Sequence, residues 1–337
     1  MGLGAAAYAR GVEERSSGQP RVCVLAPMPL LTVTIEPAAV APGPGPTAAA
    51  SRAPVHPEIH VHAGGQGLWI ARMASSLGAD VVVCGPFGGE SGDVVAHLAH
   101  GEHLALRPSA AHGNGTYIHD RREGERREVA VMPPEPLNRH EQDDLYGTVL
   151  TEALDADVCV LTGADAATGL PTSFFHRLAA DLRTAGCLVV ADLSGDQARA
   201  VAEVGGAVMK ISHTELIEAG YASADTFEAI RAGAQALLAA GARAVVVSRA
   251  AEAGLLALPD AHLEVTTPRV RAVDHRGAGD SMTAGIAVAL ARGSSMHDAV
   301  RLGSAAGALN ATRRGLGTGR RDAIERLAQH VEVRQIR

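Results

Sequence analysis

The segment VDHRGAGDSM occupies residues 273–282 and continues into TAGIAVALA, an apolar stretch that predicts a buried helix over residues 278–291. Glycines at a helix start let backbone N–H groups point into a cavity, and the helix N-terminus adds a partial positive charge. Backbone N–H donors of this kind can bind a negatively charged group while it is transferred between two molecules. The segment therefore predicts an anion hole made by Gly277, Ala278 and Gly279.

Asp280 falls in the first turn of this predicted helix, beside the anion hole. A carboxylate there can accept a proton from a hydroxyl that attacks phosphorus, which makes Asp280 the candidate general base. Aspartate is also favoured at helix starts for capping alone. Asp274 and Asp280 could therefore be caps, and the segment by itself leaves both interpretations open.

Outward from this segment, short Val-rich strands alternate with helical patterns. Strands are predicted at residues 22–26, 81–84, 158–162, 188–192, 207–210 and 244–248. Helices are predicted at residues 68–77, 93–99, 172–185, 226–240 and 278–291. Buried strands that alternate with helices indicate a doubly wound α/β fold, with a mostly parallel sheet covered on both faces.

Two stretches depart from this alternation. Residues 32–62 and 112–132 show the polar and apolar alternation of antiparallel strands, and Gly124 marks a turn in the second stretch. We expect these strands to form a small β lid on one domain that spans residues 21–337. Residues 1–20 are small, polar and unpatterned, which predicts a disordered tail. The Pro-rich segment at residues 37–54 fits either lid or linker.

Composition excludes several classes of function. With 30 Lys and Arg against 37 Asp and Glu, the net charge is −7, which argues against a nucleic-acid partner. No apolar run approaches the roughly 18 to 20 residues of a membrane span, and no secretory signal precedes residue 21, so we expect a cytoplasmic protein without a membrane partner. Lys210 is the only lysine and Ile211 follows it, which excludes a GxxxxGK[ST] phosphate loop and the protein-kinase motifs.

Six segments together resemble one family. VDHRGAGDSM is similar to the C-terminal signature of the ribokinase-like (PfkB-type) carbohydrate kinases, and GGQGLWIAR at residues 64–72 resembles their N-terminal signature. LTGADAATGLP, VVADLSGDQARA, KISHTEL and VVVSRAAEAGLLAL follow in the order typical of the 1-phosphofructokinase and tagatose-6-phosphate kinase branch. The resemblance extends from Arg21 to about Val333. It implies the ribokinase-like fold.

The resemblance also implies an activity and the residues that carry it. The implied reaction is transfer of a phosphoryl group from MgATP to a hydroxyl of a sugar, sugar phosphate or related polyol, with Asp280 as base and the 277–279 amides as anion hole. Glu215 would organise Mg²⁺ through water. Nucleotide contacts are implied for Lys210, Ser212, Glu215, Ser248, Ala250, Gly254 and Asn310.

The implied acceptor-binding positions are Thr32, Gly64, Gly65, Gln66, Trp69 and Asn114. Several depart from the family pattern: Thr32 replaces an aspartate, Gln66 a lysine, Trp69 an asparagine and Asn114 an arginine. On the nucleotide side, Ser212 replaces an asparagine and Ala250 a glycine. Two further hypotheses therefore stay open, namely a catalytically impaired homologue that acts as a ligand-binding or regulatory protein, and a nucleoside kinase of the same superfamily.

Other interpretations of single features are weaker. GGQG after a strand resembles a dinucleotide fingerprint, but Ile70 occupies the third glycine position. His56, His60 and His62 could bind a metal, although a solvated strand is the simpler interpretation. Trp69 could line a pocket or pack in the core.

Two expectations concern the predicted lid. Four arginines around Gly124, namely Arg121, Arg122, Arg126 and Arg127, are most simply a solvated hairpin tip, with phosphate binding as the alternative. The exposed edges of the lid strands would favour aggregation unless they are covered. We expect a homodimer that pairs through the lid.

Overall fold

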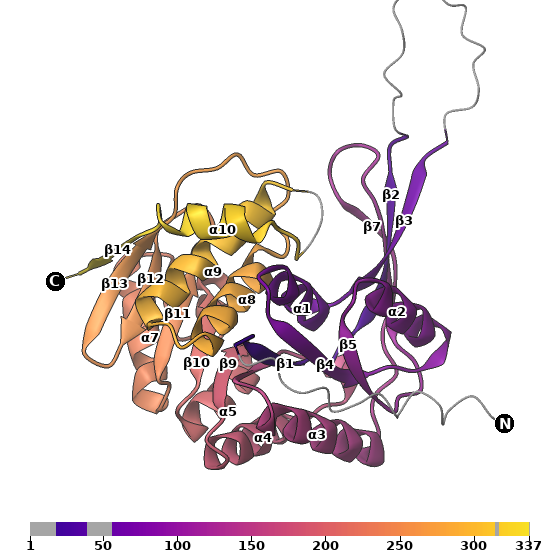
Figure 1. Ribbon diagram of the computed structural model, residues 1–337, viewed down its shortest axis with the longest axis horizontal. Coiled ribbons are helices and arrows are strands. Elements are labelled where there is room, and N and C mark those ends of the chain that lie inside the picture. Colours follow the sequence, from indigo (N-terminus) through magenta and orange to yellow (C-terminus); the bar gives the residue numbers. More distant parts are fainter. Residues whose placement is uncertain (1–17, 39–55, 314–316, 337) are drawn as a thin grey trace, which may run out of the picture.

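The computed structural model describes residues 18–38, 56–313 and 317–336 (Figure 1). Within these residues a ten-stranded sheet has the order β14-β13-β12-β11-β10-β9-β8-β1-β4-β5. Its strands are β1 (Arg21–Leu25), β4 (Asp80–Pro86), β5 (Ala105–Ser109), β8 (Val158–Thr162), β9 (Leu188–Asp192), β10 (Val208–Ser212), β11 (Ala244–Ser248), β12 (Gly254–Leu258), β13 (Ala261–Thr266) and β14 (Glu332–Gln335). From β5 to β11 all neighbours are parallel, and β12 to β14 add an antiparallel edge.

Helices cover both faces of this sheet, because side chains along each buried strand alternate between two cores. Val22 and Val24 of β1 enter one core, and Cys23 and Leu25 enter the other. The first core is covered by α1 (Gln66–Ser76), α2 (Gly89–Gly101), α8 (Ala278–Ala291), α9 (Met296–Ala311) and α10 (Arg321–Ala328). The second is covered by α3 (Arg139–Leu154), α4 (Thr172–Thr184), α5 (Gly195–Val204), α6 (His213–Glu218) and α7 (Phe227–Ala240). The predicted doubly wound α/β fold is confirmed.

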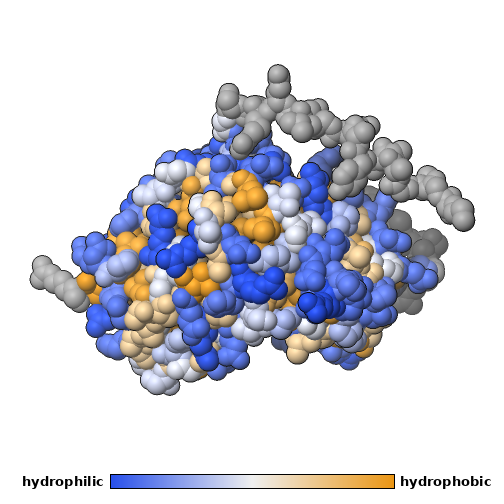
Figure 2. Space-filling view, turned by 90° about the horizontal axis from the view of Figure 1, so that it is seen from below, coloured by the Kyte–Doolittle hydropathy of each residue, from blue (hydrophilic) through white to orange (hydrophobic). Residues whose placement is uncertain are grey.

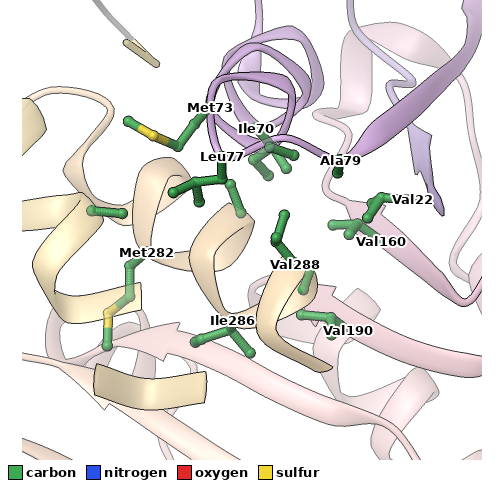
Figure 3. Packing of buried hydrophobic residues seen from close by; sticks show 14 of the residues in the cluster. Val22, Ile70, Met73, Leu77, Ala79, Val160, Val190, Met282, Ile286 and Val288 are labelled. Atoms are coloured by element: carbon green, nitrogen blue, oxygen red, sulfur yellow. The ribbon is translucent and has the colours of Figure 1, made fainter. Parts of the chain in front are cut away.

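Helix α8 is buried on nearly every side, as its apolar sequence predicts. Val288 lies between Leu77, the residue that follows α1, and the sheet residue Val190, and Ile286 lies beside Val190 (Figure 3). The two glycines Gly285 and Gly303 allow α8 and α9 to approach closely, since a Cβ on Gly285 would lie 2.7 Å from the Cα of Gly303. This packing fixes the start of α8, where the predicted anion hole lies.

Four strands form a second, small sheet that rises above the body (Figure 1). They are β2 (Leu30–Glu36), β3 (Glu58–Gly64), β6 (Gly115–Asp120) and β7 (Arg127–Met132), in the order β3-β2-β6-β7. Strands therefore occur in both stretches that depart from the α/β alternation. Most of the Pro-rich segment at residues 37–54 lies outside the described residues, as does most of the predicted tail at residues 1–20.

The described residues form no helix that is long and apolar enough to cross a membrane. On the face that carries α3 and α4, hydrophilic residues predominate and hydrophobic ones form small separate groups (Figure 2). Of the nine large exposed hydrophobic side chains among the described residues, five lie on the small sheet: Ile59, Val61, Val129, Val131 and Met132.

Candidate active site

No side chain caps the start of α8, and the Ala278 N–H donates to the His275 carbonyl oxygen (3.4 Å). Gly277 is the N-cap in the left-handed region (φ 70°), which favours glycine. Asp274 instead braces the loop, since it accepts a hydrogen bond from the Arg276 N–H (3.1 Å) and an ion pair from Arg121. The capping interpretation is therefore wrong for Asp274, and Asp280 stands in the first turn without serving as the N-cap.

Asn310 of α9 holds the same loop in place. Its Nδ2 donates to the Arg276 carbonyl (2.8 Å), and its Oδ1 accepts from the Gly317 N–H (2.9 Å). Both polar atoms of this buried side chain are used in these contacts, so Asn310 acts on the site by positioning residues 274–279.

Asp280 lies in a group of charged side chains supplied by neighbouring parallel strands. Burial, together with the charges of Asp192 and Glu215, raises its pKa to about 7, and the charge of Lys210 opposes this rise. A hydrogen bond from Gln66, at the first residue of α1, also favours the carboxylate. A carboxyl group with a pKa near neutrality can both accept and return a proton in the physiological range.

Lys210 is the buried cation of this group. Its Nζ donates to both carboxylate oxygens of Asp192 (3.1 and 3.2 Å), and Thr283 of α8 donates to the same carboxylate (2.5 Å). Burial alone would lower the pKa of Lys210, but the charges of Asp192, Asp280 and Glu215 hold it above its ordinary value. A Cβ on Gly279 would lie 2.8 Å from Nζ. The ammonium therefore sits directly beside residues 277–279, the predicted anion hole, which we call the anion loop.

Glu215 and Ser212 form a capping box at the start of α6. The Glu215 Oε2 accepts from the Ser212 backbone N–H (2.8 Å) and from its hydroxyl (2.7 Å). The charge of Glu215 still acts on both Lys210 and Asp280. Among the described residues no group of three His, Cys, Asp or Glu side chains could hold a metal ion, and this includes the described His56, His60 and His62.

The loop between β11 and β12 contains the other predicted nucleotide-side residues. Ser248 ends β11 in register with Ser212 at the carboxyl edge of the sheet. Ala250 has φ 47°, a left-handed conformation that suits glycine better than alanine. Gly254 begins β12, where a Cβ would lie 2.7 Å from the Val247 carbonyl oxygen.

A cleft of about 690 Å³ separates the small sheet from the body. Its lining includes Thr32, Trp69, His119, Arg121, Arg126 and Asp274. The Thr32 hydroxyl is buried and has no hydrogen-bond partner among the described residues. Trp69 lines the cleft one helical turn from Gln66, and Gln66 contacts Asp280, so α1 connects the cleft to the candidate base.

The remaining predicted acceptor residues support this cleft in different ways. A Cβ on Gly64 would lie 2.2 Å from the Thr32 hydroxyl, and Gly65 has φ 105° at the N-cap of α1, so both positions require glycine. Asn114 is 3% exposed, and its side chain bonds the backbones of Pro29, Pro86 and Gly88. It does not join the cleft.

Sequence reasoning missed several residues of the site. Asp192 and Thr283 fall in a predicted strand and a predicted helix, but neither is predicted as a site residue. For Asp192 a signal exists, since an aspartate at the end of a buried strand often marks a functional site. Arg121 and Arg126 line the cleft, so the interpretation of all four hairpin arginines as solvated is wrong for these two. Arg122 and Arg127 are exposed as expected.

Comparison with solved structures identifies the fold. Phosphofructokinase-2 from Escherichia coli, solved in complex with potassium, is 23% identical and superposes with a TM-score of 0.78 over 93% of this chain and 99% of that chain. The ribokinase of Arabidopsis thaliana is 19% identical, with a TM-score of 0.67 over 93% and 99%. The molecule has the ribokinase-like fold.

The family follows from the sequence comparison. The family model "pfkB family carbohydrate kinase" matches residues 42–323, so the chain belongs to this family. An ATP-dependent 6-phosphofructokinase isozyme 2 of Mycobacterium tuberculosis is 29% identical over 325 residues, which are 94% of this chain and 93% of the relative. The chain is thus a carbohydrate kinase, and kinases of this family use ATP as the phosphate donor.

Proposed function

We propose that Asp280 is the general base in the transfer of a phosphoryl group from ATP to a hydroxyl of a sugar, sugar phosphate or related polyol in the cleft. The observation that carries this proposal is the environment of Asp280, which stands in the first turn of α8 directly after residues 277–279 and has its pKa raised to about 7. A carboxylate in this environment accepts the hydroxyl proton as that oxygen attacks phosphorus.

The other groups of the site have complementary roles in this proposal. The backbone N–H groups of residues 277–279 hold the transferring phosphoryl group, and Lys210 places a fixed positive charge beside them. Ser212, Ser248, Ala250 and Gly254 belong to the nucleotide side. Trp69 offers an aromatic face to the acceptor, and the unpartnered Thr32 hydroxyl offers a hydrogen bond.

Magnesium fits this site only in part through protein ligands. Since the described residues offer no three-ligand cluster, Glu215 would hold Mg²⁺ through water, and most of the coordination would come from the nucleotide phosphates. Bound there, Mg²⁺ would neutralise charge that develops on the phosphates.

We further propose that residues 21–337 work as one kinase unit, with the lid strands from residues 32–62 and 112–132, and that two copies pair through the outer face of the lid. Ile59 and Val61 on β3 are 65% and 41% exposed. They share one face with Val33 and Ile35, their partners on β2. A face of this kind is more typical of an interface than of a solvated sheet.

The experiment that tests the function is a screen of acceptors. Purified protein is incubated with ATP and MgCl₂, and ADP release is followed over free sugars, sugar monophosphates, cyclitols and nucleosides. We expect saturable ADP release with at least one sugar-derived acceptor. Release that never exceeds the acceptor-free rate, in a protein that binds ATP, would favour the impaired homologue, and turnover of nucleosides alone would favour the nucleoside kinase.

A further inference from the structure

Two arginines of the hairpin between β6 and β7 point into the cleft, and their surroundings differ. Arg121 is already neutralised, because it forms ion pairs with Glu36 and Asp274. Arg126 forms no ion pair with a carboxylate among the described residues, and its Nε is buried without a hydrogen-bond partner there. A buried guanidinium N–H that lacks a partner is costly, which makes Arg126 the unusual member of the pair.

His119 holds the Arg126 side chain in this position. Arg126 Nη2 donates to His119 Nδ1 (2.9 Å), and since a guanidinium can only donate, Nδ1 is the acceptor. The other ring nitrogen, Nε2, then carries the proton and donates to Thr34 Oγ1 (3.0 Å). Burial and the charges of Arg126, Arg121 and Arg276 lower the pKa of His119 to about 4, so the imidazole stays neutral and keeps accepting.

The described residues place more positive than negative charge around Arg126, namely Arg276 and Arg121 against Asp274. Burial first, and then the nearby charges of Arg276 and Arg121, lower the pKa of Arg126 to about 10, while Tyr117 and Asp274 oppose this shift. The guanidinium also lies over the Tyr117 ring, 5.1 Å from its centroid. These contacts fix the group in one orientation beside the cleft.

We propose that Arg126, with Arg121 beside it, binds an anionic group of the acceptor, either a phosphate or a carboxylate, at the hairpin end of the cleft. This inference rests on the proposed function, since it names the class of acceptor for the same site. A fork of N–H donors that is held rigidly by His119 matches two oxygens of such a group. It also gives the buried Nε the partner that the described protein residues do not supply.

The test compares neutral acceptors, fructose and glucose, with related anionic ones, fructose 6-phosphate, glucose 6-phosphate and gluconate, each with ATP and MgCl₂. We expect an anionic member to have the higher kcat/KM. In the Arg126→Gln variant its KM should rise about 10- to 100-fold with little change in kcat, the size expected for one charge-assisted contact. The kinetics of the neutral sugars should stay unchanged. Arg122→Gln removes the same charge from an exposed position on the same hairpin and should behave as wild type.

Calorimetric titration of the same acceptors without ATP separates this inference from the proposed function. Loss of anion binding in Arg126→Gln supports the inference even if no acceptor is phosphorylated. A preference for neutral sugars, or an anion preference that survives Arg126→Gln, would overturn it while the kinase function stands, and absence of binding by all five compounds would also overturn it. If Arg126→Gln fails to fold, Arg126→Lys keeps the charge but loses the fork, and an unchanged KM there would count against the proposal.

Discussion

Lys210 is the only lysine among the 30 basic side chains, and its surroundings require a slender cation. The ammonium contacts both oxygens of Asp192 and lies beside Gly279, where even a Cβ would approach Nζ to 2.8 Å. A guanidinium is broader and would displace the anion loop. Lys210 therefore links the carboxylates of the sheet edge to the start of α8.

Replacement of Lys210 by Met should strongly destabilise the protein. The change leaves the buried Asp192 carboxylate with Thr283 as its main donor, and breaking a buried pair in this way costs about 3–5 kcal/mol. Urea unfolding measures the loss. Arg139→Met, which removes a partner from an exposed pair with Asp143, serves as control and should cost less than about 1 kcal/mol. An equal loss of unfolding free energy in the two variants would show that the buried pair stabilises the protein no more than the exposed pair does.

The pH dependence of the reaction should reflect Asp280. Only the carboxylate accepts a proton, so with a pKa raised to about 7, kcat/KM should fall roughly tenfold per pH unit below 7 and level off above about pH 8. Initial rates with a saturating nucleotide from pH 5.5 to 9 measure this profile. An apparent pKa near 4 would show that the carboxyl is not desolvated as described.

At the scale of elements, the loop between β11 and β12 carries local strain. Ala250 has φ 47°, a conformation that costs a residue with a Cβ about 1–2 kcal/mol and costs glycine almost nothing. We expect Ala250→Gly to stabilise the protein by about 1 kcal/mol in thermal or urea unfolding. Ala251→Gly, at the next position, has no such strain to relieve and should be neutral or destabilising. A loss of stability in Ala250→Gly would contradict the strained conformation.

Elements with a strong apolar pattern could be predicted from the sequence. The six predicted strands correspond to β1, β4, β8, β9, β10 and β11, because each is buried on both faces and reads as a Val-rich run. Helix α3 was not singled out, since acidic residues and Gly147 interrupt its apolar face, although Asn138 and Glu141 form a capping box that marks its start. The antiparallel edge from β12 to β14 also lacks a strong pattern.

The residues of the candidate site could be predicted where the backbone conformation requires particular residue types. They could not be predicted where the tertiary fold determines which side chains enter the cleft. The Gly277 to Asp280 segment is recognisable because a left-handed residue and a helix start need those residue types. Arg121 and Arg126 look like Arg122 and Arg127 in sequence. Which of them enter the cleft depends on the hairpin register and on the irregularity between Ile118 and His119, and neither is visible in the sequence.

At the scale of the whole molecule, the apolar outer face of the small sheet predicts self-association. We expect the protein to be a dimer at micromolar concentration, and Val61→Asp to make it monomeric, because a charge in an apolar interface is not compensated. Light scattering after size exclusion measures the mass. Leu154→Asp, at an exposed apolar position at the end of α3, should remain dimeric. A monomeric mass for the wild-type protein at micromolar concentration would contradict the proposed dimer.

The Asp280→Asn variant removes the candidate base and leaves the rest of the site in place. If Asp280 is the base, kcat should fall by about 10² to 10⁴ while ATP affinity changes little, since asparagine keeps the shape and cannot take the proton. The variant should also be more stable than wild type at pH 8, because the raised pKa means that folding disfavours the ionised carboxyl as pH rises from about 4 to 7. Asp298→Asn, in the first turn of α9, is the matched control and should keep full activity. An Asp280→Asn enzyme that retains most of its kcat would contradict the account.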